Sequence, residues 1–209
     1  MTHSASAPGA AGFWDQRYGV EDYVFGTEPN RFLSAQTAHL KPGMRALAVA
    51  DGEGRNGVWL ARQGLEVVSV DASAVGLAKA RKLAAAHDVP LTTVLADIGD
   101  FDWGHESFDV VVAIFVQFAD PALRTRMFTG MQQALRSGGL LLLQGYRPEQ
   151  LAYGTGGPSA AENLYTAELL RTAFSAMEID SLREHDSEIA EGLGHRGMSA
   201  LIDLVARKP

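Results

Sequence analysis

The stretch RALAVADGEGRNGVWLAR, from Arg45 to Arg62, decides the fold of this chain. It begins with an apolar run that suits a buried strand and ends with residues that suit the opening of an amphipathic helix. Between these two parts, Gly52, Gly54 and Gly57 fit the spacing G-x-G-x-x-G, which lets the backbone turn tightly and approach an anionic group. A strand, a glycine loop and a helix in this order predict a nucleotide-like binding site at the carboxyl end of a strand.

The same loop carries two acids, Asp51 and Glu53, which would lie close to a pyrophosphate and oppose it. Like charges in close contact repel by about 1 kcal/mol or more when they are partly buried. The amide groups at the helix N-terminus can still meet a single carboxylate. The loop therefore favours a ligand that combines positive charge with a carboxylate, as S-adenosylmethionine does. A tight turn with solvated acids and no ligand is the simpler alternative.

The bulk composition excludes several classes of protein. The chain has 209 residues, a net charge of −7 and no cysteine. This length suits one domain with a sizeable core. The negative charge argues against nucleic-acid or anionic-membrane binding, which need a basic surface. The absence of cysteine excludes a disulfide scaffold, a thiolate zinc site and a catalytic cysteine, and we expect no metal site.

The N-terminal segment MTHSASAPGAAG, residues 1–12, is small and polar. We interpret it as a disordered tail, because it lacks the apolar stretch of an export signal. The longest apolar runs elsewhere have the length of strands and are too short to span a membrane. These observations predict a cytoplasmic protein.

Strands and helices alternate along the rest of the chain. Apolar runs predict strands over Ala46–Ala50, Glu66–Val70, Leu91–Ala96, Phe108–Val116 and Leu140–Gln144. Capping residues and periodicity predict helices over Glu28–Leu40, over Asn56–Gln63, from Ser73 to about His87, from Asp120 to Ser137–Gly139 and from Thr166 to about Met177. Strands that are apolar throughout are typical of a parallel sheet with helices on both faces.

The C-terminal part departs from this alternation. The segment from Gly145 to Tyr165 has little periodicity, and loops this long inside a compact domain are usually functional or disordered. Because it follows the carboxyl end of a strand, we predict that it covers a ligand site. The later segments EIDSLREHDSEI and SALIDLVAR predict an antiparallel hairpin at one edge of the sheet.

Two further acids end predicted strands. Asp71 follows the second strand, where an acid can accept both hydrogen bonds from a ribose diol. Asp97 follows the third strand and suits an adenine amino group, with Ile98 packing on the ring. A lone Asp at the position of Asp71 is also a common helix cap, and a lone Asp at the position of Asp97 is more often a cap or turn residue. The ordered series of glycine loop, Asp71 and Asp97 indicates an adenosine-bearing ligand.

With these residues in place, the chain resembles the class I S-adenosylmethionine-dependent methyltransferases from about Phe13 onward. The glycine loop, VSVDAS, LADIGDF, FDVVVAIF, ALRSGGLLLL and the terminal hairpin carry the resemblance. The segments FWDQRYGVEDYVFGTEPNRFL and GEGRN are most similar to the branch with tellurite-resistance-type and thiopurine-type methyltransferases.

The resemblance implies an α/β fold, a Rossmann-like three-layer sandwich. Its sheet would be seven-stranded and mostly parallel, with an antiparallel C-terminal strand. Residues 13–209 would form a single methyltransferase domain that binds S-adenosylmethionine. Within it, residues 13–43 would cover the cofactor and residues 145–165 would form a substrate lid.

One departure from the family pattern concerns the end of the first strand. The usual pattern is acid-x-Gly-x-Gly-x-Gly, but Ala48 and Ala50 occupy the positions of the acid and the first glycine. In the family, that acid helps to hold the methionine ammonium. Asp51 is the neighbouring acid that could replace it.

The resemblance places cofactor-binding residues on the N-terminal segment and at the strand ends. They are Trp14, Tyr18, Tyr23, Phe25, Ala50, Asp51, Gly52, Gly54, Asn56, Asp71, Ala72, Asp97, Ile98, Phe115 and Gln117. The aromatic faces among them can contact a sulfonium, although ordinary hydrophobic docking of an N-terminal helix would also explain them.

Substrate contacts are expected from the lid and the hairpin, at Tyr146, Arg147, Tyr153 and Arg196. The candidates for a catalytic role are His195, Tyr146 and Gln117, and none is an evident general base. A soft nucleophile such as a thiolate or selenide needs little help from a base, and orienting it in line with the methyl group would suffice. A histidine base would indicate an oxygen or nitrogen acceptor.

The favoured hypothesis is a methyltransferase, monomeric or homodimeric, for a small-molecule acceptor such as a thiol, selenium or tellurium species. A methyltransferase-like module that binds the cofactor without turnover is the second hypothesis, motivated by Ala48 and Ala50. An NAD-dependent oxidoreductase is the third. The acidic loop and the lack of a Tyr-x-x-x-Lys pattern count against it.

Overall fold

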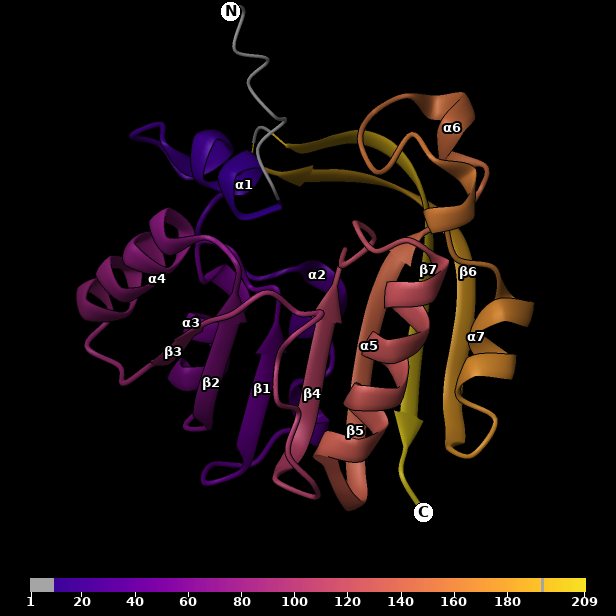
Figure 1. The fold of residues 1–209 in the computed structure, drawn as a ribbon, viewed down its shortest axis with the longest axis horizontal. Helices are drawn as coiled ribbons and strands as arrows, with labels where there is room; N and C mark the ends of the chain where they lie inside the picture. Colours follow the sequence, from indigo (N-terminus) through magenta and orange to yellow (C-terminus); the bar gives the residue numbers. More distant parts are fainter. Residues whose placement is uncertain (1–9, 193) are drawn as a thin grey trace, which may run out of the picture.

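A computed structural model describes residues 10–192 and 194–209. One seven-stranded sheet with the order β3-β2-β1-β4-β5-β7-β6 runs through the molecule (Figure 1). The strands are β1 (Arg45–Val49), β2 (Glu66–Asp71), β3 (Thr92–Leu95), β4 (Phe108–Ile114), β5 (Leu135–Tyr146), β6 (Glu178–Glu191) and β7 (His195–Arg207). Pairing is parallel from β3 to β5, and β7 runs antiparallel to both of its neighbours. The predicted fold class is therefore confirmed.

Helices cover both faces of this sheet (Figure 1). They are α1 (Ala10–Tyr18), α2 (Arg31–Ser34), α3 (Arg55–Arg62), α4 (Ala74–Ala86), α5 (Pro121–Ala134), α6 (Gln150–Tyr153) and α7 (Ala167–Ala173), with 3-10 turns at Thr37–His39 and Ala161–Asn163. Along β1, Leu47 and Val49 pack in the cluster that contains α5 and α7, whereas Ala46 and Ala48 pack in the cluster that contains α2 and α3. Burial on both faces explains why the central strands are apolar throughout.

Three helix starts were predictable from single polar residues. The side chains of Ser73, Asp120 and Thr166 each accept a hydrogen bond from the backbone N–H three residues later, and so cap α4, α5 and α7. Such caps satisfy donors that the first turn of a helix leaves without partners.

The structure corrects two predicted helices and one boundary. The helix predicted over Glu28–Leu40 is wrong: Asn30 caps α2 through the N–H of Leu33, and the segment then continues as the 3-10 turn. Helix α5 ends at Ala134 rather than at Ser137–Gly139, because β5 begins at once and pairs with β4. Helix α1 begins at Ala10, so residues 10–12 are helical, and the rest of the predicted tail lies outside the described residues.

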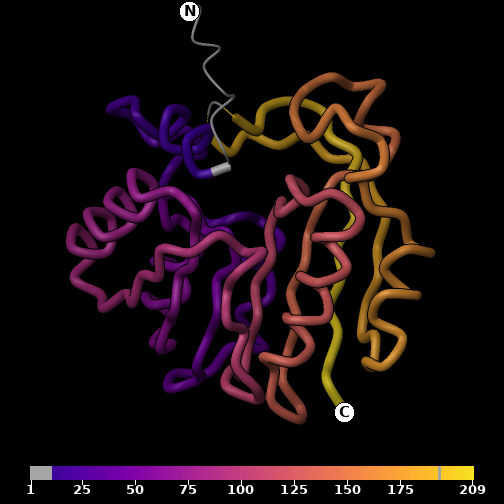
Figure 2. Tube along the Cα trace, in the orientation of Figure 1, coloured from indigo at the N-terminus to yellow at the C-terminus, as the bar shows by residue number. Residues whose placement is uncertain are grey.

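The hairpin of β6 and β7 extends well beyond the sheet. Strand β5 pairs with β7 only from Leu201 onward, and the remainder of the hairpin arches over the carboxyl edge of the sheet toward α1 (Figures 1 and 2). The segment 145–165 is more ordered than predicted, since it contains the end of β5, α6 and a 3-10 turn. No helix within the described part of the chain is long and apolar enough to cross a membrane.

Candidate functional site

A cavity of about 500 Å³ lies at the carboxyl ends of β1 to β5. Helix α1, the segment near Phe25, the hairpin tip and residues 156–158 complete its walls. The sequence-predicted residues that line it are Trp14, Tyr18, Phe25, Ala50, Asp51, Gly52, Asn56, Asp71, Ala72, Asp97, Ile98, Phe115, Gln117, Tyr146 and His195. The fold thus brings together side chains from the two ends of the sequence.

Two predicted cofactor residues, Gly54 and Tyr23, lie outside the cavity lining and contact α4. Gly54 has a φ of +87°, and a Cβ there would lie 2.5 Å from the Cβ of Ala80, so the glycine lets α3 and α4 approach closely. Tyr23 lies outside the cavity lining, and its hydroxyl donates to the carbonyl oxygen of Lys79 at 3.1 Å.

Three predicted substrate residues also lie outside the cavity lining. Arg147 forms an ion pair with Asp186 on the hairpin, and the hydroxyl of Tyr153 donates to the same carboxylate at 3.0 Å. Arg196 is exposed on β7. Arg147 and Tyr153 thus tie the lid segment to the hairpin. Arg196 faces solvent, because alternate side chains of a strand point to opposite faces.

Asp71 holds the glycine loop from within the cavity. One carboxylate oxygen accepts from the backbone N–H of Gly52 and the other from that of Ser73, both at 2.8 Å. Burial raises the pKa of Asp71, although these backbone hydrogen bonds favour its charged form. A carboxylate has about four acceptor positions, so Asp71 keeps capacity for further donors such as a ribose diol.

Asp51 braces the loop against the protein interior. Its carboxylate accepts from the N–H of Gly57 at 3.2 Å and from the hydroxyl of Ser69 at 2.8 Å. Burial is the main cause that raises its pKa to about 7. Ala48 lies in an apolar cluster, and nothing polar occupies the position of the family's acid. These contacts give Asp51 a role in loop structure, and the residue also lines the cavity.

Glu53 does not oppose a bound ligand in the way its charge suggested. The side chain is buried, and its carboxylate pairs with Lys79 at 2.8 Å and accepts from the N–H of Val24 at 2.8 Å. These contacts compensate its charge and fasten the N-terminal segment to the glycine loop. The expectation that Glu53 repels an anionic ligand is therefore wrong, because Lys79 compensates its charge.

His195 is enclosed by aromatic rings. It stacks on Phe25 with centroids 4.6 Å apart and on Phe115 with centroids 4.5 Å apart. Its Nδ1 lies 2.6 Å from the hydroxyl of Tyr146. Burial, helped by the positive charges of Arg55 and Arg17, lowers the pKa of His195 to about 3. The imidazole is therefore neutral near pH 7 and is a weak base.

Two other features distinguish this end of the cavity. Gln117 donates to the carbonyl oxygen of Tyr146 and accepts from its N–H, so it braces the backbone and is not free to act catalytically. Ala50 and Phe115 both have positive φ, 47° and 56°, although neither is glycine. Such strain tends to gather at ligand sites.

Comparison with known proteins agrees with this geometry. Residues 46–139 match the sequence model of a family described as methyltransferase domain. This part of the chain is thus similar to a methyltransferase domain. An uncharacterized methyltransferase of Synechocystis sp. is 29% identical over 122 residues, which are 57% of this chain and 55% of that protein. The match thus spans little more than half the length of this curated relative.

Solved structures share the fold of this chain over almost its whole length. One concerns the conversion of a disulfide bond into a thioacetal group during echinomycin biosynthesis, with a TM-score of 0.77 and 19% identity over 95% of this chain and 91% of that one. TehB from Haemophilus influenzae has a TM-score of 0.70 and 16% identity over 95% and 67%. The [4+2]-cyclase SpnF has a TM-score of 0.67 and 18% identity over 95% and 92%. At such identities the likeness shows the fold alone.

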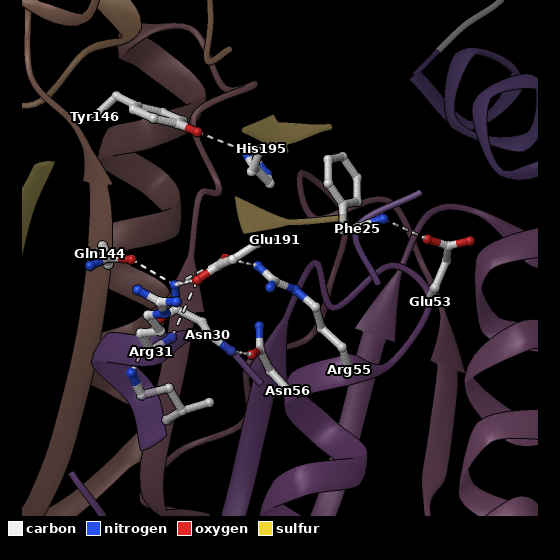
Figure 3. A network of polar contacts seen from close by, with 11 residues as sticks. Phe25, Asn30, Arg31, Glu53, Arg55, Asn56, Gln144, Tyr146, Glu191 and His195 are labelled. Atoms are coloured by element: carbon white, nitrogen blue, oxygen red, sulfur yellow. Dashed lines mark hydrogen bonds and ion pairs between the residues drawn. The ribbon is translucent and has the colours of Figure 1, made fainter. Parts of the chain in front are cut away.

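Sequence reasoning missed most members of a polar network that borders the cavity (Figure 3). Arg55 pairs with Glu191 at 2.7 Å, and Glu191 accepts from the Nδ2 of Asn30 at 3.1 Å. The same Nδ2 donates to Gln144 at 2.7 Å, and the backbone N–H of Asn30 donates to Asn56 at 3.0 Å. The motif GRN drew attention to Arg55 and Asn56, but no local signal identifies partners so distant in sequence.

Two cavity residues on α1 were also missed. Phe13 is half exposed, and the guanidinium of Arg17 lies 5.5 Å from the ring centroid of Phe25. Each is adjacent in sequence to a predicted residue, Trp14 or Tyr18, but only the docking of α1 over the sheet reveals that they line the cavity too. Among the residues that the structure describes, no group of three His, Cys, Asp or Glu side chains could hold a metal ion.

Proposed function

We propose that this protein transfers a methyl group from S-adenosylmethionine to a small-molecule acceptor with a soft nucleophile, such as a thiol or a selenium or tellurium species. The observation that carries this proposal is the cavity of about 500 Å³ over the glycine loop, with Asp71 at its floor and a neutral Tyr146–His195 pair at its acceptor end. Ligand pockets for small molecules commonly fall in this range of volume.

The residues present suit the cofactor. Asp71 retains acceptor capacity for a ribose diol, and Ala72 and Ile98 offer apolar surface to an adenine. Asp97 accepts from the N–H of Gly99 through one oxygen, which leaves the other for an exocyclic amino group. Trp14 and Phe25 supply aromatic faces for a cation. When bound, S-adenosylmethionine supplies an electrophilic methyl group.

The acceptor end of the cavity favours a nucleophile that arrives with a free lone pair. His195 is neutral, its Nδ1 is taken by Tyr146, and its low pKa makes proton abstraction unfavourable. The stacked rings of Phe25 and Phe115 exclude water and hold the imidazole in place. The chain therefore acts by orienting and desolvating the acceptor, which suffices for thiolates and selenides.

One structural neighbour concerns sulfur chemistry, namely the conversion of a disulfide bond into a thioacetal group. TehB shares the fold. We propose that this chain belongs to the same branch as the tellurite-resistance-type and thiopurine-type methyltransferases.

Calorimetry and turnover test the proposal in two steps. S-adenosylhomocysteine should bind the wild-type protein, and Asp71→Ala should weaken binding by about tenfold or more, since hydrogen bonds to a charged group contribute about 1.5–3 kcal/mol. Asp100→Ala, which changes an exposed acid outside the cavity lining, is the matched control. Absence of binding at millimolar concentration would contradict the proposal.

A panel of methyl acceptors then tests the reaction. Thiophenol and a selenol should be methylated in preference to phenol and aniline. The rate should rise with the ionised fraction of the acceptor. The ionisation of His195 should not affect the rate between pH 5 and 8, because the pKa of that side chain is about 3. A preference for phenol or aniline would contradict the proposed soft acceptor and indicate an oxygen or nitrogen acceptor.

A module that binds the cofactor without turnover is the second candidate. The strained backbone of Ala50 and the inward bonds of Asp51 favour it, because both alter the end of β1. The fold likeness to a [4+2]-cyclase is compatible with it. This candidate predicts S-adenosylhomocysteine binding with no methyl transfer to any acceptor of the panel.

A further inference from the structure

Arg55 and Glu191 form a buried ion pair between the glycine loop and the roof of the cavity. Arg55 is the first residue of α3, and Glu191 is the last residue of β6. Their side chains are only 7% and 6% exposed, and Nη2 lies 2.7 Å from Oε2. Figure 3 shows the guanidinium reaching from α3 to the hairpin. A buried charge pair of this kind needs further hydrogen bonds to offset its desolvation.

The two partners differ in how completely they are satisfied. The carboxylate of Glu191 accepts from Arg55, from the Nδ2 of Asn30 and from the backbone N–H of Arg31. The Nη1 of Arg55 is buried and has no partner among the described residues. A guanidinium presents five donors, and a buried donor without an acceptor is destabilising. Because Arg55 lines the cavity, a ligand bound there can supply the missing acceptor.

We propose that Arg55 binds the carboxylate of the cofactor through Nη1 while Nη2 holds Glu191, so that an occupied cofactor site fixes the hairpin over the acceptor site. This inference rests on the proposed function. A carboxylate is the acceptor that suits a guanidinium best, and S-adenosylmethionine carries one. Arg17, the other arginine of the cavity lining, is exposed and lies over the ring of Phe25.

Contacts near Glu191 connect the cofactor site to the acceptor site. The N–H of Gly194 donates to the carbonyl oxygen of Val24 at 3.1 Å, which joins the hairpin tip to the N-terminal segment. The next residue, His195, stacks between Phe25 and Phe115. A hairpin held by Glu191 therefore holds the aromatic walls of the acceptor site. Arg55 is a positioning residue that makes the acceptor bind after the cofactor.

The test compares two ligands that differ only in the carboxylate. S-adenosylhomocysteine and its decarboxylated form, which keeps the ammonium, are titrated into wild-type protein and into the double variant R55Q/E191Q by calorimetry. In the double variant two amides replace the ion pair, and neither charge is left buried alone. Wild type should prefer S-adenosylhomocysteine by about tenfold or more, and the double variant should bind both ligands within about threefold.

Hydrogen exchange supplies a readout that a merely structural role would not change. In wild type, S-adenosylhomocysteine should slow amide exchange in peptides of β6 and β7 by more than the decarboxylated ligand does at equal saturation. In R55Q/E191Q the two ligands should give the same protection. The single variant Arg55→Lys keeps a positive charge beside Glu191. It should therefore keep part of the preference for S-adenosylhomocysteine over the decarboxylated ligand.

The outcomes separate this inference from the proposed function. Equal binding of the two ligands to wild type, or a preference that survives in R55Q/E191Q, overturns the role of Arg55 and leaves the proposed function intact. Failure of wild type to bind either ligand overturns the proposed function itself and the inference with it. If S-adenosylhomocysteine binds tightly but both ligands protect the hairpin of β6 and β7 equally, the proposed coupling between the cofactor site and the hairpin is wrong.

Discussion

The glycine loop and the hairpin tip both border the cavity, and each depends on a buried carboxylate. In the loop, Asp71 bonds to the N–H groups of Gly52 and Ser73, and Asp51 bonds to Gly57 and Ser69. At the hairpin tip, Glu191 depends on partners from the other end of the chain. The loop is thus supported by its own strand–helix neighbourhood, whereas the hairpin tip is supported only by completed tertiary structure.

Removing the carboxylate of the hairpin tip should have the largest effect on stability. Glu191→Ala leaves Arg55 buried without its counter-ion, and we expect a loss of about 3–5 kcal/mol in the free energy of unfolding. Urea denaturation followed by circular dichroism measures it. Asp180→Ala, which breaks a half-exposed pair with Arg207 on the same hairpin, should cost less than about 1 kcal/mol. Equal losses in the two variants would contradict the comparison.

A substitution in the loop itself should come next. Gly54→Ala forces an alanine into the left-handed region and places its Cβ 2.5 Å from that of Ala80, so we expect a loss of about 2–4 kcal/mol. Gly138→Ala is the matched control, since its φ is +75° with nothing within 4 Å of the added Cβ, and it should cost about 1–2 kcal/mol. Denaturant midpoints of the two variants separate the contact from the backbone strain.

The pH dependence of stability tests the aromatic enclosure near the hairpin tip. The folded-state pKa of His195 is lowered from 6.5 to about 3, so the unfolded chain binds more protons between these values. Its contribution to stability is full above pH 6.5 and is lost as the pH falls toward 3, by up to about 1.4 kcal/mol per pH unit. His195→Gln should remove this slope in urea titrations between pH 4 and 6.5.

Asp51 has the opposite pH dependence and must be separated from this effect. Its pKa is raised from 3.8 to about 7, so its contribution is full below pH 3.8 and is lost as the pH rises through 7. The difference between wild type and His195→Gln at each pH isolates the histidine, because both proteins keep Asp51. An unchanged slope in the variant would show that the imidazole is not held neutral by burial.

The smallest expected effect lies at the end of β1. Ala50 has a φ of 47°, so Ala50→Gly should relieve left-handed strain and raise stability by about 0.5–1 kcal/mol. Ala48→Gly in the strand just before it should instead lower stability by about 0.5–1 kcal/mol. Thermal unfolding of the two variants compares them directly. A gain at Ala50 would show that the alanine found here is tolerated by the loop rather than required by it.

Sequence reasoning reached the helices and strands better than the long-range contacts, for a physical reason. Apolar runs and single capping residues such as Ser73 act over one turn of helix or one strand, and these predictions are confirmed. The pairing of Arg55 with Glu191 spans 136 residues and leaves no local trace. The same holds for Glu53, whose charge looked free in sequence but is compensated by Lys79 in the folded chain.

The placement of β7 between β5 and β6 has a consequence for synthesis on the ribosome. Strand β6 reaches the sheet only through β7, although β7 is made after it. Until β7 has emerged, the apolar residues Leu140–Leu143 of β5 present an unpaired strand edge, which is the kind of surface that nascent chains aggregate through. Strand β7, which follows β6 in the sequence, therefore completes this side of the sheet and closes the edge in one step.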